Sequence, residues 1–307
     1  MKRTLAALLS ACLLFALCGC AAGQTPRASR IFFISMDQTD QYWTQIDAGC
    51  RRAAEELGNI DYRWIAPDVK DSAKQIEVIN NAVADGADAI ILTAVSTEAV
   101  NDALLAAYQA GVLIVYADSP ASFSPSVATF CTDNEAAGRQ AGQTMLEYLH
   151  RLGVTDGRIG IVSVSATIAS TAAREAGFRA AFEGSAFELL DARYCDGDFV
   201  RSKDVASALI AEGCVGIYGT NEGSTVGVGN AIRESGSSVV GVGYDDSDNI
   251  RELREGGYLA ATMAQNPGRM GYEGLKAAAA ALYGGAADGR VVDTGVTVLH
   301  GAAPETP

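Results

Sequence analysis

The sequence predicts an α/β fold made of two lobes, each a doubly wound parallel sheet. Short apolar runs alternate with segments whose apolar residues recur at helical spacing; the alternation begins at Arg30 and restarts near Ile159. Most of the apolar runs are continuous, which is typical of parallel strands covered by helices on both faces. Two such blocks, of roughly 100 residues each, have the usual size of domains.

The first block contains apolar runs that we predict to be strands. Between them, apolar residues at helical spacing predict helices over 43–57 and 76–83. Gly58, Gly86 and Gly111 stand where helices should end, because glycine readily adopts the left-handed backbone of a helix C-cap. The predicted strands are Ile31–Ser35, Tyr62–Ala66, Ala89–Thr93, Leu113–Ala117 and Val127–Thr132.

The second block repeats this pattern. Its glycine-rich run Gly223–Gly229 lacks the lysine and the spacing of a phosphate-binding loop, so we interpret it as a place of close helix packing. The predicted strands are Ile159–Val164, Leu189–Tyr194, Gly216–Thr220, Val239–Tyr244 and Leu259–Ala264. The predicted helices cover 135–152, 171–183, 203–212, 224–235 and 247–255, followed by Gly268–Tyr283 and short strands near 291–299.

Residues 1–19 have the layout of a secretory signal peptide. A basic start precedes an apolar run over 5–17, which is too short for a stable membrane span. The ending Leu-Cys-Gly-Cys at 17–20 resembles the bacterial lipobox, which would make Cys20 the first mature residue and its acylation site. A secreted protein with a chance cysteine is the alternative.

Residues 20–29 would then form a lipidated N-terminus and a flexible tether, since they are small, polar and contain proline. No second long apolar run follows, so the lipid would be the only membrane contact. We expect an extracytoplasmic protein, anchored to the cell membrane at a Gram-positive surface or in a Gram-negative periplasm. Residues 301–307 are expected to be a frayed tail.

Charge and residue counts argue against several classes of function. The formal net charge of −14 repels nucleic-acid phosphates, so no nucleic-acid partner is expected. The only histidines are His150 and His300, and we place neither at a strand end, which argues against a histidine-activated nucleophile or a histidine metal site. The phosphate loops of nucleotide-binding proteins are absent. We therefore expect no cofactor and no metal.

Four cysteines remain in the predicted mature chain besides Cys20. A domain of this size does not need disulfides for stability, and the cysteines are widely spaced. A bridge between Cys195 and Cys214 stays open, but we favour buried free thiols. The four are Cys50, Cys131, Cys195 and Cys214.

Polar and aromatic residues collect just after the predicted strands. In open α/β sheets, ligands bind outside the carboxyl ends of the strands. Each residue alone could be a helix N-cap. Together, carboxylates, amides, an arginine and aromatic rings suit the hydroxyls and C–H faces of an uncharged polyhydroxylated ring. The candidates are Asp40, Tyr42, Trp43, Asp118, Arg174, Phe199, Asn221, Asp245 and Gln265.

Several short motifs at these positions occur together and in a specific order. They are Val-Tyr-Ala-Asp-Ser (115–119), Cys-Thr-Asp-Asn (131–134), Thr-Ala-Ala-Arg-Glu-Ala-Gly-Phe (171–178), Thr-Asn-Glu (220–222), Val-Gly-Tyr-Asp (242–245) and Ala-Thr-Met-Ala-Gln-Asn-Pro (261–267). Over residues 30–285 the chain resembles the ribose/galactose-type periplasmic sugar-binding proteins of ABC importers. The resemblance implies a type I periplasmic binding protein fold, in which two lobes close on a monosaccharide over a three-segment hinge.

The resemblance also implies a role for individual residues. Sugar hydroxyls would be bound by Asp118, Arg174, Asn221, Asp245 and Gln265. An aromatic sandwich would be formed by Tyr42, Trp43 and Phe199. The hinge would contain Thr132, Asp133 and Asn266, with a third crossing near Gly295. The N-terminal lobe would comprise 30–132 and 266–294, and the C-terminal lobe 133–265 and 295–300.

The chain departs from the family pattern close to the sugar. Ser119 stands where ribose binders have an arginine, and Asp40 where their first loop carries an asparagine. The calcium loop of galactose binders is absent. The cavity would hold Asp40, Asp118 and Asp245 against Arg174 alone. A hexose, another pentose, an amino sugar or a polyol therefore fits at least as well as ribose.

These observations predict an extracytoplasmic solute-binding lipoprotein that is a monomer and not an enzyme. It would capture a monosaccharide or related polyol by hinge closure and deliver it to the membrane subunits of an ABC permease. The alternative is a receptor of the same fold that presents a sugar-like signal to a sensor kinase or chemoreceptor. A glycosidase that uses Asp118 and Asp245 rests only on the paired carboxylates.

Overall fold

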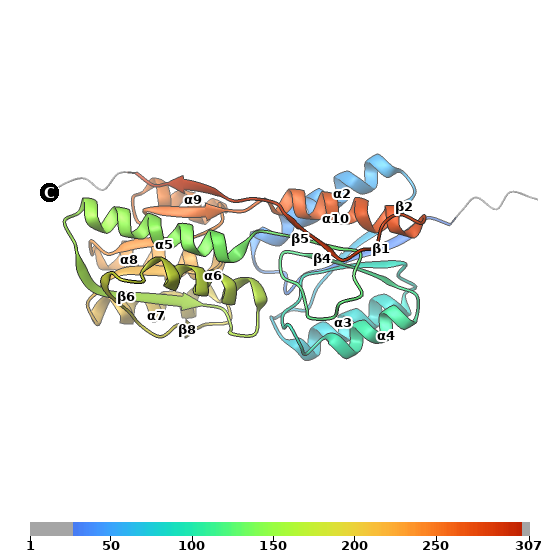
Figure 1. Ribbon diagram of the computed structural model, residues 1–307, viewed down its shortest axis with the longest axis horizontal. Helices are drawn as coiled ribbons and strands as arrows, with labels where there is room; N and C mark the ends of the chain where they lie inside the picture. The colour runs from blue at the N-terminus through green and yellow to red at the C-terminus, as the bar shows by residue number, and fades with distance from the viewer. Residues whose placement is uncertain (1–26, 303–307) are drawn as a thin grey trace, which may run out of the picture.

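The computed structural model describes residues 27–302 as two α/β lobes lying end to end (Figure 1). The predicted leader, the acylation site Cys20 and most of the tether lie outside the described residues, as do residues 303–307. Within 27–302, no helix is both long and apolar enough to cross a membrane. The chain passes from one lobe to the other three times, so each lobe combines distant parts of the sequence.

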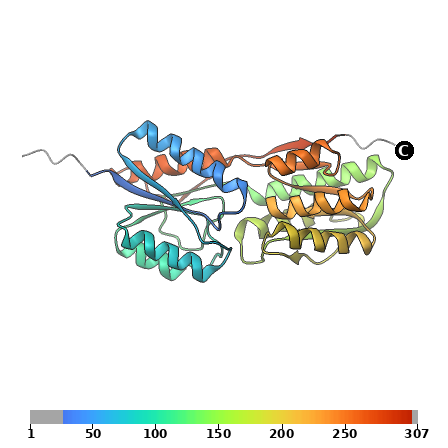
Figure 2. The same cartoon turned by 180° about the vertical axis from the view of Figure 1, so that it is seen from behind.

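The N-terminal lobe is a parallel sheet covered by helices on both faces. Its strands are β1 (Ser29–Ile34), β2 (Ile60–Ile65), β3 (Ala89–Leu92), β4 (Leu113–Ala117), β5 (Ala128–Cys131) and β12 (Arg290–Asp293). Its helices are α2 (Gln41–Leu57), α3 (Ser72–Ala84), α4 (Asn101–Gln109) and α10 (Pro267–Leu282). The strand order is β12-β5-β4-β3-β1-β2. α2 and α10 cover one face, and α3 and α4 the other (Figures 1 and 2).

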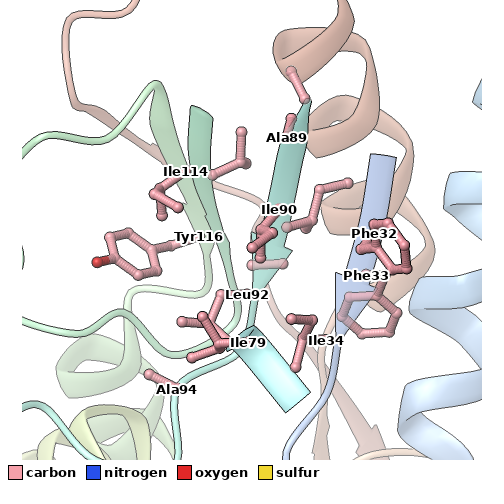
Figure 3. Packing of buried hydrophobic residues seen from close by; sticks show 14 of the residues in the cluster. Phe32, Phe33, Ile34, Ile79, Ala89, Ile90, Leu92, Ala94, Ile114 and Tyr116 are labelled. Carbon is pink, nitrogen blue, oxygen red and sulfur yellow. The ribbon is translucent and has the colours of Figure 1, made fainter. Parts of the chain in front are cut away.

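Burial on both faces explains why these strands are continuous apolar runs. Figure 3 shows Phe33 and Ile34 of β1 beside Ile90 and Leu92 of β3, with Ile79 of α3 close to them. All five side chains are completely buried. Removing such a side chain from water contributes roughly 1.5–3 kcal/mol to folding. The strand ends that lead into the site are therefore held by a tightly packed core.

The C-terminal lobe is built in the same way, with one exception in its sheet. Its strands are β6 (Asp156–Ser163), β7 (Ala186–Leu189), β8 (Arg193–Tyr194), β9 (Cys214–Gly219), β10 (Val240–Tyr244), β11 (Ala261–Ala264) and β13 (Thr297–His300). Its helices are α5 (Asn134–Arg151), α6 (Ala169–Ala181), α7 (Phe199–Ala211), α8 (Glu222–Ser235) and α9 (Asp248–Glu255). The order is β13-β11-β10-β9-β6-β7, with β8 also paired to β6. Only β13 runs antiparallel to its neighbour in this described sheet.

Two sequence predictions for this lobe were wrong in detail. The run Leu189–Tyr194 is not one strand: β7 pairs with the first half of β6 and β8 with its second half. His300 does lie at a strand end, because it is the last residue of β13. Since β13 is antiparallel, its end pairs with the start of β11, at the edge of the sheet opposite the strand ends that face the other lobe. The conclusion that His300 takes no part in the site is unaffected.

Glycines allow the helices of the C-terminal lobe to approach closely. A Cβ on Gly227 of α8 would lie 2.5 Å from the side chain of Ser202 on α7. A Cβ on Gly223 would overlap the carbonyl oxygen of Gly197. The interpretation of the glycine-rich run as close helix packing is confirmed. Cys50, Cys195 and Cys214 are buried free thiols, as favoured from the sequence, whereas the free thiol of Cys131 is only half-buried.

The three connections between the lobes lie side by side. They are the links from β5 to α5, from β11 to α10 and from β12 to β13, the last visible along the upper edge of Figure 1. The hydroxyl of Thr132 donates to Oε1 of Gln265 at 3.0 Å, which joins the first link to the second. The amide of Asp133 donates to Asp293 at 3.1 Å, which joins the first to the third. These hydrogen bonds tie the three segments together at the boundary between the lobes.

Candidate functional site

A cavity lies between the two lobes. It is placed where the carboxyl ends of the parallel strands of both lobes meet, as expected for an α/β site. All predicted ligand residues except Phe199 line it. The lining consists of Met36, Asp40, Tyr42, Trp43, Lys70, Asp118, Val164, Ile168, Ser170, Thr171, Arg174, Asn221, Glu222, Asp245 and Gln265.

Asp118 and Asp245 occupy equivalent places in the two lobes. Each directly follows a central strand, β4 or β10, and each has a left-handed backbone, with φ of 66° and 75°. Their amides donate to the neighbouring strands, to Phe130 O at 2.9 Å and Met263 O at 3.0 Å. Residues other than glycine rarely adopt this backbone conformation, and such backbone strain is concentrated at functional sites. The two carboxyl groups are thus held at the cavity by their backbones.

Arg174 joins these aspartates through a network of buried contacts. Its guanidinium lies 3.7 Å from Asp118 and 4.1 Å from the centre of the Tyr244 ring. Its donors reach Asn134 Oδ1 at 2.7 Å, Thr220 O at 2.9 Å and Gln265 Oε1 at 2.6 Å. α6 begins at Ala169, two residues before the predicted start, so Arg174 lies beyond the first turn. The helix dipole, which disfavours a cation near a helix N-terminus, therefore costs Arg174 little.

The carboxyl groups next to Arg174 are difficult to ionise. Burial raises the pKa of Asp245 to about 7, although the charge of Arg174 opposes the rise. Burial also raises the pKa of Asp118, with Arg174 and the Tyr42 hydroxyl opposing. The Tyr42 hydroxyl donates to Asp118 Oδ1 at 2.9 Å, and Gln265 Nε2 donates to Asp245 Oδ1 at 2.8 Å. Each carboxyl group has a second oxygen to offer to a ligand hydroxyl.

Sequence reasoning missed Lys70, a second cation at the cavity. Lys70 Nζ lies 3.2 Å from Asp40 and also pairs with Asp37. Burial raises the pKa of Asp40 to about 7, although Lys70 opposes it. Lys70 comes from the loop between β2 and α3, a few residues after the strand end, so a wider search of the strand-end loops would have included it.

Glu222, next to the predicted Asn221, was also missed. With Lys70 and Glu222 included, four carboxyl groups face two cations, a formal charge of −2 if all are ionised. The statement that Arg174 is the only cation was wrong, but the cavity still has more carboxyl groups than cations. Because ionised carboxylates without partners are costly to bury, the raised pKa values and the buried cations are both needed to stabilise this lining.

The aromatic part of the site differs from the predicted sandwich. Tyr42 and Trp43 line the cavity, with ring centres 5.1 Å apart in an edge-to-face arrangement. Phe199 is 47% exposed and lines a separate surface hollow. It is the first residue of α7, and the preceding Asp198 caps that helix, which directs Phe199 away from the cavity. Val164 and Ile168 provide the apolar wall of the cavity from the C-terminal lobe instead.

The position of Arg174 depends on a glycine contact between α5 and α6. A Cβ on Gly138 would overlap the carbonyl oxygen of Arg174, and a Cβ on Gly177 would overlap that of Glu135. The Gly138→Ala substitution should therefore force the helices apart and lower the stability by about 1–3 kcal/mol. It should also weaken solute binding by displacing Arg174. Thermal unfolding and calorimetry test this, with Gln143→Ala on the exposed side of α5 as the control; equal effects of both substitutions would contradict it.

Among residues 27–302, no group of three or more His, Cys, Asp or Glu side chains is arranged to hold a metal ion. The lining instead combines hydrogen-bonding groups with the Trp43 ring and aliphatic side chains. Such a lining suits a molecule that has hydroxyl groups on its edge and C–H groups on its faces.

Known proteins share both the sequence pattern and the structure. The ribose import binding protein RbsB of Haemophilus influenzae is 27% identical over 290 residues, covering 92% of this chain and 94% of that protein. A solved carbohydrate-transporter solute-binding protein from Agrobacterium radiobacter, in complex with D-arabinose, is 27% identical with a TM-score of 0.85, covering 90% of this chain and 95% of that one. Another, from Agrobacterium vitis with bound D-fucose, is 26% identical with a TM-score of 0.83, covering 89% and 95%.

The family model described as a periplasmic binding protein domain matches residues 31–286. This range includes both sheets except for β12, β13 and the first two residues of β1. The two parallel-sheet lobes joined by three segments are the type I periplasmic binding protein fold. The chain therefore belongs to the periplasmic binding protein family.

Proposed function

We propose that this protein is an extracytoplasmic solute-binding lipoprotein that captures a neutral monosaccharide and delivers it to an ABC permease. The observation that carries the proposal is the pair of strained aspartates, Asp118 and Asp245, which flank Arg174 at equivalent strand ends of the two lobes. With such an arrangement, residues of both lobes can bind the hydroxyl groups of one ligand at the same time. Solute bound between the lobes would stabilise the closed form, which is how hinge closure depends on ligand.

The cavity has the mixed polarity expected of a site for a sugar ring. Trp43 and Ile168 offer apolar surface, while Asn221 and Gln265 offer amide groups that can donate and accept. A carboxylate that accepts two hydroxyl groups needs no positive charge on the ligand. We therefore favour a pentose or a hexose over an amino sugar or a charged solute.

The relatives support the same class of solute and the same role. The name of the Haemophilus influenzae relative refers to ribose import, and the two solved structures contain D-arabinose and D-fucose. By analogy, we propose a monomer that docks on permease subunits outside the cytoplasm, held by a lipid on Cys20. Its lobes would be residues 30–132 with 266–294 and residues 133–265 with 295–300. Bending at Thr132, Asp133 and Asn266 would open and close them.

A thermal-shift screen tests the ligand class. The panel contains pentoses, hexoses, inositols, amino sugars and polyamines. A micromolar ligand at millimolar concentration should stabilise the protein by about 4 kcal/mol by mass action. We expect the largest shift with a neutral pentose or hexose, together with a smaller radius of gyration in X-ray scattering. A phosphorylated sugar or a dicarboxylate as the tightest ligand would overturn this proposal.

Uptake by cells separates transport from signalling. Deletion of the gene should abolish high-affinity uptake of the sugar found in the screen, and the cloned gene should restore it. Normal uptake together with loss of a sugar-dependent transcriptional response would favour the receptor that presents ligand to a sensor kinase.

A further inference from the structure

Helix α2 of the N-terminal lobe receives its N-terminal cap from the other lobe. The first N–H groups of a helix have no partner within the helix and need an acceptor. Asp40 holds the N-cap position, but its side chain makes no capping hydrogen bond and pairs with Lys70 instead. The Tyr42 amide donates to Glu222 Oε2 at 2.9 Å, and the Gln41 amide donates to Glu222 Oε1 at 3.2 Å.

Glu222 is well suited to hold two helix ends together. It is the first residue of α8, so its carboxylate lies at the positive ends of both α8 and α2. It is only 7% exposed, so water screens these interactions little. Both oxygens are used by backbone donors of the opposite lobe. When the lobes separate, the carboxylate loses both donors and α2 loses its cap.

A second contact between the lobes lies beside the first. The Asp248 amide donates to Gln41 Oε1 at 3.0 Å, and Gln41 Nε2 donates to Asp248 Oδ2 at 3.3 Å. The side chain of Asp248 is 78% exposed, so this pair contributes little by itself. It does show that the two lobes are in direct contact at the start of α2. Glu222 is therefore the main direct contact at this edge of the cavity.

We infer that Glu222 is a latch between the lobes that stabilises the closed form and holds the start of α2 over the cavity. The latch acts through backbone groups and does not require a solute. It goes beyond sugar binding, because it favours the closed form before solute arrives and slows its opening, together with the other contacts between the lobes, among them the Ser170 amide that donates to Ser119. Since Tyr42 and Asp40 belong to the same helix start, the latch also positions these two lining residues.

Hydrogen exchange in the absence of solute tests the latch directly. Amides in the first turn of a helix are unprotected unless something caps them, so the exchange of Gln41 and Tyr42 reports on the latch. In Glu222→Ala both amides should exchange about tenfold to a hundredfold faster, the range expected for losing charge-assisted hydrogen bonds. The radius of gyration in X-ray scattering should increase, because the open form becomes more populated.

Two further variants make the test decisive. Glu222→Gln keeps the size of the side chain but loses the charge and one acceptor oxygen. Its exchange rates and radius of gyration should therefore lie between those of wild type and of Glu222→Ala. Glu234→Gln, an exposed position on the same helix paired with Lys203, should change neither measurement. Unchanged exchange of Gln41 and Tyr42 in folded Glu222→Gln and Glu222→Ala proteins would overturn the inference. Because no sugar is added, failure of the sugar screen leaves this result intact.

Discussion

Replacing Arg174 with alanine should weaken solute binding by about 2–4 kcal/mol, a loss of roughly thirtyfold to a thousandfold. Arg174 is 2% exposed and its donors organise Asn134, Thr220 and Gln265 around the cavity. Its loss removes a charged donor from the site and leaves Asp118 without its counter-charge. Calorimetry with the sugar found in the screen measures the effect.

The same substitution should also destabilise the protein without solute. In the structure Arg174 is a buried cation with several acceptors, and removing one partner of such a network costs about 3 kcal/mol or more. Chemical denaturation should show this loss.

One further variant separates charge from geometry at this position, and another serves as a control. Arg174→Lys keeps a cation but cannot supply the planar fork of donors, so it should recover part of the stability and little of the affinity. Arg139→Ala removes an exposed arginine of α5 that pairs with Glu135 and should have little effect on either. Wild-type affinity in Arg174→Ala would show that the solute binds elsewhere.

Stability without solute should fall as the pH rises from about 5 to 8. Burial raises the pKa of Asp245 to about 7 from an ordinary value of 3.8. Between these two values the folded protein holds a proton that the unfolded chain has lost, so protonation favours the folded state. Above pH 7 the folded protein must bury an ionised carboxylate. The difference amounts to about 2–4 kcal/mol for this group.

Asp245→Asn provides the test, because it keeps the shape of the side chain and removes its titration. The variant should be more stable than wild type at pH 8 and show a weaker dependence on pH. Part of the dependence should remain, since burial also raises the pKa of Asp40 to about 7. The exposed Asp204→Asn on α7 is the control. An unchanged pH dependence in Asp245→Asn would refute this assignment.

Solute binding should respond to pH in the opposite direction. If the carboxylates of Asp118 and Asp245 accept sugar hydroxyls, the bound form requires them ionised and binding releases protons. The affinity should then rise with pH through the same range, by at most about tenfold per pH unit for each proton released. Calorimetry in buffers of different ionisation enthalpy counts those protons. Proton uptake on binding would contradict this role for the two aspartates.

The sequence by itself determined the fold class and most of the site. Continuous apolar runs identified the parallel strands, because helices bury both faces of such sheets, and the parallel order places all strand ends at one edge. Asp118 and Asp245 follow central strands directly, so no knowledge of loop geometry was needed to place them beside the cavity. The run Leu189–Tyr194 shows the limit of predicting strands from apolar runs, because composition could not reveal that two short strands share β6 as their partner.

Only the tertiary structure decided which side chains of the loops and helix ends face the cavity. Lys70 is held at the cavity by its ion pairs with Asp37 and Asp40, whereas the exposed Phe199 starts a helix capped by Asp198. The cap that Glu222 places on α2 joins groups 180 and 181 residues apart. Local patterns predict elements because each element is stabilised by its own periodicity, but these contacts depend on how two separately packed lobes meet.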